Sequence, residues 1–286
     1  MNKVMESEKI KKFASSNGAS VIGVASLERF SKAPKGHRPT DFLKDARSVI
    51  VQGIRVLPSV VNWHDHLKDS EKLTPLKRKF LAWGIYHTCG YAVVNQKLQL
   101  LALDMALFLE NQGFKSIFFP VTGPYDFDTN RLMLERPDWY TEFELALEKE
   151  ERDYDKEEKT KPPTFFFSFS HRHAAVLAGL GRFGLSNLVL TPDYGPRMRF
   201  ISVVTTAEIV PDPMIGEDIC LYNKTGCTKC IDNCKFDALT CPDKIDMCGL
   251  KMPFAHFDEN KCGDQYLPCG GICMNVCPVG LKKNIS

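Results

Sequence analysis

The placement of the cysteines constrains this chain more than any other feature of its sequence. The 286 residues include 11 cysteines, and ten of them lie between Cys220 and Cys277, which leaves only Cys89 outside. Disulfide frameworks belong to short secreted chains, whereas a chain of this length buries enough surface to fold without covalent cross-links. We therefore expect the cysteine-rich segment to bind metal.

Two similar cysteine patterns occupy this segment. They read C-x6-C-x2-C-x3-C and C-x6-C-x3-C-x3-C-Pro, and their members are Cys220, Cys227, Cys230 and Cys234, then Cys262, Cys269, Cys273 and Cys277. A [4Fe–4S] cluster needs four thiolates, and in two-cluster ferredoxins the fourth cysteine of each run binds the other cluster. This rule predicts one cluster on Cys220, Cys227, Cys230 and Cys277, and a second on Cys234, Cys262, Cys269 and Cys273.

Other cysteines leave parts of this assignment open. Cys241 and Cys248 repeat the six-residue spacing, so either could replace Cys262 as a ligand. Structural zinc is the competing interpretation, but Cys₄ zinc sites usually pair two C-x2-C motifs and this chain has one, so the pattern favours clusters. Cys89 stands alone at the start of an apolar segment, where a free cysteine is usually a small buried apolar residue.

Hydrophobic periodicity predicts a mixed α+β body over residues 1–212, followed by the cysteine-rich domain over 213–286. We expect helices at 6–17 and at 81–111, the second as one long helix or two, and strands at 20–25, 47–54, 116–121 and 199–206. The stretch from Glu148 to Lys161 is almost all charged, which is typical of a solvated helix end and loop.

Composition narrows the class of protein further. The net charge is +2, so there is no basic surface for general nucleic-acid binding, although a local patch for tRNA is not excluded. The N-terminus has neither an apolar signal region nor a twin arginine, and no run approaches about 18 apolar residues. We expect a cytoplasmic protein that does not contact membranes.

A glycine loop, Gly179 to Gly184, fits the dinucleotide-binding pattern G-x-G-x-x-G. That pattern is meaningful only between a strand and a helix. Here residues 173–178 look helical and residues 188–192 look extended, so the match is accidental as a dinucleotide site. The glycines still indicate a tight turn or a close approach of the backbone to a ligand or another segment.

The stretch from Ser170 to Gly184, continued by Leu190 to Arg199 and then by the cysteine segment, resembles the epoxyqueuosine reductases and the cobalamin-dependent reductive dehalogenases. The resemblance implies a nitroreductase-like body that carries cobalamin, joined to a ferredoxin-like domain with two [4Fe–4S] clusters. It implies that a low-potential donor such as ferredoxin or flavodoxin reduces the clusters, which reduce the corrinoid. The reaction would be the reduction of a small or nucleoside-type substrate.

The resemblance also implies site residues. The corrinoid would be bound by residues in and after the glycine loop: Gly179, Leu180, Gly181, Arg182, Gly184, Asn187 and Arg197. Where epoxyqueuosine reductases carry an acidic proton donor before the loop, this chain has His171 and His173, and Tyr86 is the other candidate donor. The alternative function is a non-catalytic electron-transfer or corrinoid-activator protein that passes electrons to a partner.

Overall fold

The computed structural model describes residues 5–63, 74, 77, 81, 83–121, 169–258, 261–262 and 271–281. These residues belong to one compact unit, Met1–Val121 with Phe169–Ser286, which joins the body to the cysteine-rich segment. The second unit, Thr122–Ser168, lies outside the described residues, as does the charged stretch at 148–161. The domain boundary at 212 and 213 stays a prediction.

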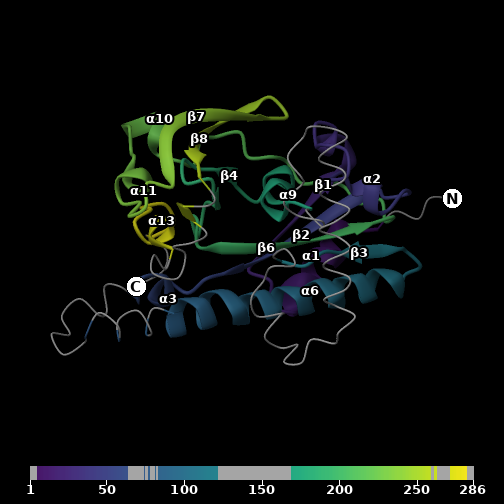
Figure 1. The fold of residues 1–286 in the computed structure, drawn as a ribbon. Helices are drawn as coiled ribbons and strands as arrows, with labels where there is room; N and C mark the ends of the chain where they lie inside the picture. Colours follow the sequence, from purple (N-terminus) through teal and green to yellow (C-terminus); the bar gives the residue numbers. More distant parts are fainter. Residues whose placement is uncertain are drawn as a thin grey trace, which may run out of the picture. The chain divides into compact units, whose positions relative to one another are not determined.

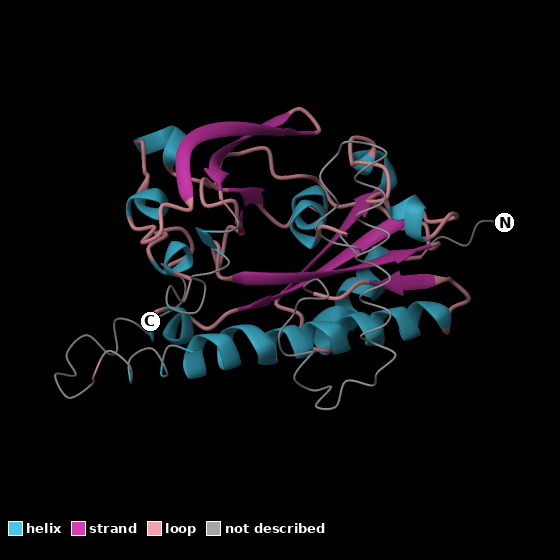
Figure 2. Ribbon diagram, in the orientation of Figure 1, coloured by secondary structure: helices cyan, strands magenta, loops and turns pink. Residues whose placement is uncertain are grey.

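A four-stranded antiparallel sheet forms the centre of the body, as Figures 1 and 2 show. Its order is β1 (Val21–Ser26), β2 (Ser48–Arg55), β6 (Met198–Thr205) and β3 (Ser116–Phe118). All four predicted strands are confirmed. β3 ends two residues before Pro120, which has no amide hydrogen to continue a ladder.

Helices cover both faces of the sheet. Because side chains alternate along a strand, Val49 and Val51 of β2 face the core that includes α9 (His171–Leu177), while Ile50 faces the core that includes α1 (Ser7–Ser16) and α6 (Val93–Glu110). Figure 1 shows α6 and α9 on opposite sides of the strands. The mixed α+β class is confirmed.

The long apolar segment predicted at 81–111 forms two consecutive helices, the π-helix η2 (Trp83–Ala92) and α6. Gly84–Glu110 is the one helical stretch among the described residues that is long and apolar enough to cross a membrane, with a mean hydropathy of 1.3. One such helix is weak evidence, since core helices share this composition. Leu98, Met105 and Leu109 of α6 are buried against the sheet, whereas Leu100 and Leu107 are exposed.

Where the structure describes it, the cysteine-rich part contains a long hairpin and short helices. The hairpin is β7 (Leu239–Met247) with β8 (Leu250–Phe257), and the helices are α10 (Tyr222–Thr225), α11 (Lys229–Asp232) and α13 (Ile272–Asn275). A small ribbon of β4 (Arg182–Phe183) and β5 (Val189–Leu190) connects this part to the body. The body also contains η1 (Leu27–Phe30), α2 (Pro39–Phe42) and α3 (Pro58–Val61).

Candidate metal centre

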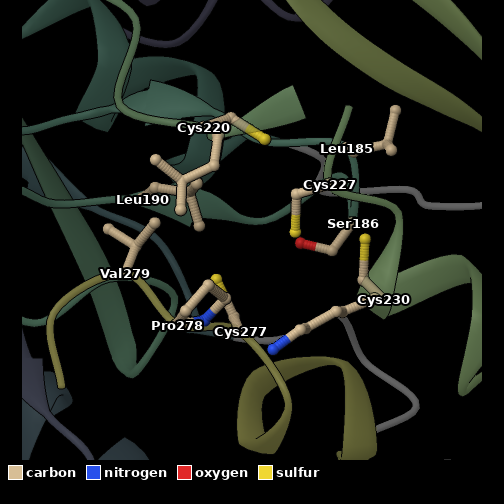
Figure 3. A pocket seen from close by; sticks show the side chains of 11 residues that line it. Leu185, Ser186, Leu190, Cys220, Cys227, Cys230, Cys277, Pro278 and Val279 are labelled. Atoms are coloured by element: carbon tan, nitrogen blue, oxygen red, sulfur yellow. The ribbon is translucent and has the colours of Figure 1, made fainter. Parts of the chain in front are cut away.

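Four cysteines from two distant parts of the chain surround one hollow. Cys220, Cys227 and Cys230 come from the segment around α10 and α11, and Cys277 follows α13. Figure 3 shows their sulfur atoms directed into the space between them. The space between the lining residues, including the part open to solvent, is about 340 Å³. The structure therefore brings together the four cysteines that the spacing rule assigned to one cluster.

The rest of the lining keeps this hollow largely apolar. Leu185 and Leu190 come from the loop and strand after the glycine turn, and Pro278 and Val279 follow Cys277 directly. Proline cannot extend the helix α13, so the chain leaves it and crosses back toward the body. An apolar lining lowers the local dielectric and strengthens any electrostatic interaction at the four sulfurs.

The thiols of this hollow are crowded and poorly solvated. Burial raises the pKa of the Cys230 thiol to about 12, and the charges of Cys220 and Cys277 add to that shift. Burial likewise raises the pKa of Cys277, although its hydrogen bond with the Val279 backbone and the positive charge of Arg197 act in the opposite direction. Four thiolates at this site need a positive counter-charge, and metal binding supplies it while it releases the protons.

The spread of the sulfur atoms bears on which metal fits. Among the described residues, no three cysteine, histidine, aspartate or glutamate side chains are grouped so that they could hold a single metal ion. A zinc ion draws its sulfur ligands to about 2.3 Å, whereas a cluster distributes four irons over its corners and keeps its thiolates further apart. Four cysteines around one hollow match the number of thiolates that a [4Fe–4S] cluster needs.

Only part of the second predicted set is described. Cys234 and Cys273 both pack against the small apolar core that contains Leu185 and Leu239. Cys262 is described and partly buried, but Cys269 lies outside the described residues. Cys241 and Cys248 are exposed on the hairpin and its turn. The choice among Cys241, Cys248 and Cys262 as ligand stays a prediction.

Arg197 links the body to the chain around Cys277. It is 1% exposed, and its guanidinium donates hydrogen bonds to the backbone oxygens of Val279 (2.8 Å), Cys277 (2.7 Å) and Asn275 (3.2 Å). The family resemblance implies that this side chain binds a corrinoid. In the structure its donors are directed at the cysteine segment instead.

The other residues predicted to bind a corrinoid also have partners within the protein. A Cβ atom at Gly179 would lie 2.2 Å from the Pro213 oxygen, and one at Gly181 would lie 2.4 Å from the Leu190 oxygen. At Gly184 a Cβ would meet the Leu190 side chain, and Leu180 packs against the body core. The close approach that the glycines predicted is therefore made to this chain's own backbone.

The two polar members of that set anchor the hairpin. Arg182 is buried and donates to the backbone oxygens of Ile215, Gly216 and Lys251, and it pairs with Asp218 at 2.9 Å. The Asn187 amide donates to the Ala255 oxygen at 2.9 Å and accepts from the Ala255 amide at 3.2 Å. Both therefore contact protein groups at the positions where a corrinoid was predicted.

The candidate proton donors have low basicity. His171 is buried, its Nε2 donates to the Pro120 oxygen at 2.9 Å, and its Nδ1 therefore accepts from the Ser202 hydroxyl at 3.0 Å. Burial lowers the pKa of His171 to about 4, and desolvation together with the Arg172 charge lowers that of His173 to about 4. Both rings are neutral at pH 7, which does not support a histidine as proton donor.

Tyr86 and Cys89 lie on η2 with different surroundings. Tyr86 is buried beneath α13, with its hydroxyl 3.8 Å from the Met274 sulfur. A Cβ at Gly271 would come within 2.6 Å of that hydroxyl, so the helix that carries Cys273 packs directly on the tyrosine. Cys89 is exposed, so the expectation that it is a buried apolar residue is wrong. The turn of η2 directs it to solvent, since an apolar segment alone does not decide which side faces the core.

Two glycines that the sequence analysis did not single out hold the Cys277 segment against the body. A Cβ at Gly195 would lie 2.1 Å from the Val279 oxygen, and one at Gly280 would lie 2.3 Å from the Gly195 amide nitrogen. Both have positive φ angles, +57° and +76°. The glycines were visible in the sequence, but their mutual contact joins positions far apart in the chain.

Comparisons with known proteins find relatives that match part of the chain. No family model matches the chain. The tetrachloroethene reductive dehalogenase of Sulfurospirillum multivorans is 32% identical over 120 residues, which are 39% of this chain and 23% of that protein. The epoxyqueuosine reductase of Bacillus subtilis is 28% identical over 133 residues, which are 44% of this chain and 33% of that protein. The matches thus span a third or less of these relatives' lengths.

Solved structures of reductive dehalogenases are similar to this chain. A reductive dehalogenase described in connection with B12-dependent dehalogenation has a TM-score of 0.56 over 95% of this chain and 31% of its own, at 17% identity. The catabolic reductive dehalogenase NpRdhA has a TM-score of 0.56 over 97% of this chain and 33% of its own, at 16% identity. At such identity the likeness concerns the fold. Parts of the chain are thus similar in sequence to a reductive dehalogenase and to an epoxyqueuosine reductase, and its fold is similar to that of reductive dehalogenases.

Proposed function

We propose that this chain is an iron–sulfur oxidoreductase that passes low-potential electrons through two [4Fe–4S] clusters to reduce a small or nucleoside-type substrate. The observation that carries the proposal is the convergence of Cys220, Cys227, Cys230 and Cys277 on one apolar hollow (Figure 3). A bound cluster would accept and release one electron at a time. The relatives' names, all reductases, support the same class of reaction.

At this site the protein would position the four thiols and shield a bound cluster. The chain brings three thiols from one segment and one from another, so a cluster would also join two parts of the fold. Leu185, Leu190 and Val279 line the hollow beside the sulfurs, and these apolar side chains would shield part of a bound cluster from water. The Arg197 hydrogen bonds fix the backbone on either side of Cys277.

The residues named for the corrinoid do not form a cradle for it. The glycines approach this chain's own backbone, and Arg182, Asn187 and Arg197 direct their polar groups at protein oxygens. We therefore derive no reaction step through cobalamin from these residues. A corrinoid electron acceptor stays part of the proposal because of the resemblance alone.

This finding favours a second candidate function. A protein with clusters but no corrinoid would transfer electrons to a partner or activate a corrinoid protein. Both candidates share a cytoplasmic location, a low-potential donor such as ferredoxin or flavodoxin, and no contact with membranes. They differ in whether the isolated chain binds cobalamin.

One preparation distinguishes these functions. Protein purified without oxygen and reconstituted should contain about eight irons and eight sulfides per chain. The visible spectrum is then recorded as cobalamin is added. Saturable uptake with a spectral shift supports the reductase, and full iron without uptake supports the electron-transfer protein. Stoichiometric zinc with iron near zero would contradict both.

A further inference from the structure

No carboxylate among the described residues pairs with the buried arginine beside the candidate cluster. Arg197 is 1% exposed, and within the described part of the chain it has no carboxylate partner. Its Nε is buried with no hydrogen-bond partner there. Arg182 is buried to a similar degree, but it is paired with Asp218 at 2.9 Å. The two arginines therefore differ in net local charge although both bind backbone oxygens.

The positive charge of Arg197 lies beside the backbone of one predicted cluster ligand, Cys277. Arg197 Nη2 donates to the backbone oxygen of Cys277 at 2.7 Å, and its other bonds go to residues two positions to either side, Asn275 and Val279. The guanidinium thus holds the backbone around a single thiolate. A buried charge is screened little by salt or water, so its field acts on the cluster that this thiolate would bind.

We propose that Arg197 is a positioning residue that raises the reduction potential of the cluster bound through Cys277. The inference rests on the proposed function, because it requires a cluster at the Cys220, Cys227, Cys230 and Cys277 hollow. Reduction adds one electron to a centre that already carries four thiolates. A nearby positive charge stabilises the reduced form more than the oxidised form, and the potential rises.

Three variants separate the charge from the hydrogen bonds. Arg197→Gln removes the charge and keeps a donor, while Arg197→Lys keeps the charge and loses the planar fork of donors. Lys229→Gln is the matched control, because Lys229 also lines the hollow but is exposed, so solvent screens its charge. Each protein is reconstituted without oxygen, its iron and sulfide are counted, and the cluster potentials are measured by redox titration followed by electron paramagnetic resonance.

The expected result is that Arg197→Gln shifts one reduction wave to a lower potential and leaves the other in place. Arg197→Lys should keep the wild-type potential at lower thermal stability, and Lys229→Gln should shift the wave much less than Arg197→Gln. An Arg197→Gln protein with full iron and an unchanged potential overturns the inference, as does an equal shift in Arg197→Lys. If Arg197→Gln fails to assemble, a wild-type potential in Arg197→Lys supports the inference and a lowered potential in Arg197→Lys overturns it. Wild-type protein without iron would instead refute the proposed function.

Discussion

At the scale of single residues, several polar side chains that look chemically active are held by hydrogen bonds inside the protein. His171 shows this most clearly, because both ring nitrogens are engaged and the ring lies between α9 and the sheet. Its sequence context, beside a glycine turn, suggested a proton donor. The sequence could not reveal Pro120 and Ser202 as its partners, since both come from other elements.

The depressed pKa of His171 predicts an acid-dependent loss of stability. The pKa falls from 6.5 to about 4 on folding because burial disfavours the charged ring. Between these values the unfolded chain binds more protons, so stability falls as the pH drops from 6.5 toward 4 and is unaffected above 6.5 by this group. This pKa shift corresponds to a decrease of at most about 3 kcal/mol in the free energy of unfolding.

Urea unfolding at a series of pH values measures this effect. In His171→Gln the stability difference between pH 7 and pH 4 should be smaller than in the wild type. Equal pH dependence in the two proteins would show that His171 does not titrate in this way.

Asn187 gives a second prediction at this scale. It has a positive φ of 59°, and its amide makes two hydrogen bonds with Ala255. Asn187→Ala should lower the free energy of unfolding by about 2–3 kcal/mol, from two lost hydrogen bonds and left-handed backbone strain. Asn187→Gly is the matched control, because it loses the same bonds without the strain and should cost about 1 kcal/mol less. Chemical denaturation measures both, and a neutral Asn187→Ala would contradict the anchoring role.

At the scale of elements, the link between the body and the Cys277 segment depends on a backbone crossing. Gly195, just before β6, and Gly280, just after α13, approach each other so closely that neither has room for a Cβ. The helices and strands on both sides could be predicted from their periodicity. The crossing could not, because periodicity describes one element at a time and contains no information about which elements meet.

This crossing predicts a specific effect of a single methyl group. Gly195→Ala should destabilise the fold and displace Cys277, so about half of the iron should be lost, which is one cluster of two. Gly36→Ala is the control, because Gly36 also has a positive φ, of +86°, but no atom within 4 Å of the added Cβ. It should cost about 1 kcal/mol and leave the iron content unchanged. Equal iron contents in the two variants would mean that the crossing does not position Cys277.

At the scale of the whole molecule, the sequence predicted the mixed α+β class and the four sheet strands, and the structure confirms both. It also predicted which four cysteines would meet, since the spacing rule for two-cluster ferredoxins pairs three ligands with a distant fourth. The corrinoid residues were assigned from a local motif, Gly179 to Gly184, whose glycines allow close approach without specifying to what. Tertiary packing determines what these glycines approach, and in this structure they approach the backbone of Pro213 and Leu190.

In the proposed arrangement, Cys277 completes a cluster with the three cysteines of the other segment. The most direct test compares iron and sulfide in anaerobically reconstituted wild type, Cys277→Ser and Cys89→Ser, the last carrying its substitution at an exposed cysteine outside the segment. We predict about eight irons in wild type and Cys89→Ser, and about four in Cys277→Ser. An unchanged iron content in Cys277→Ser would contradict the claim.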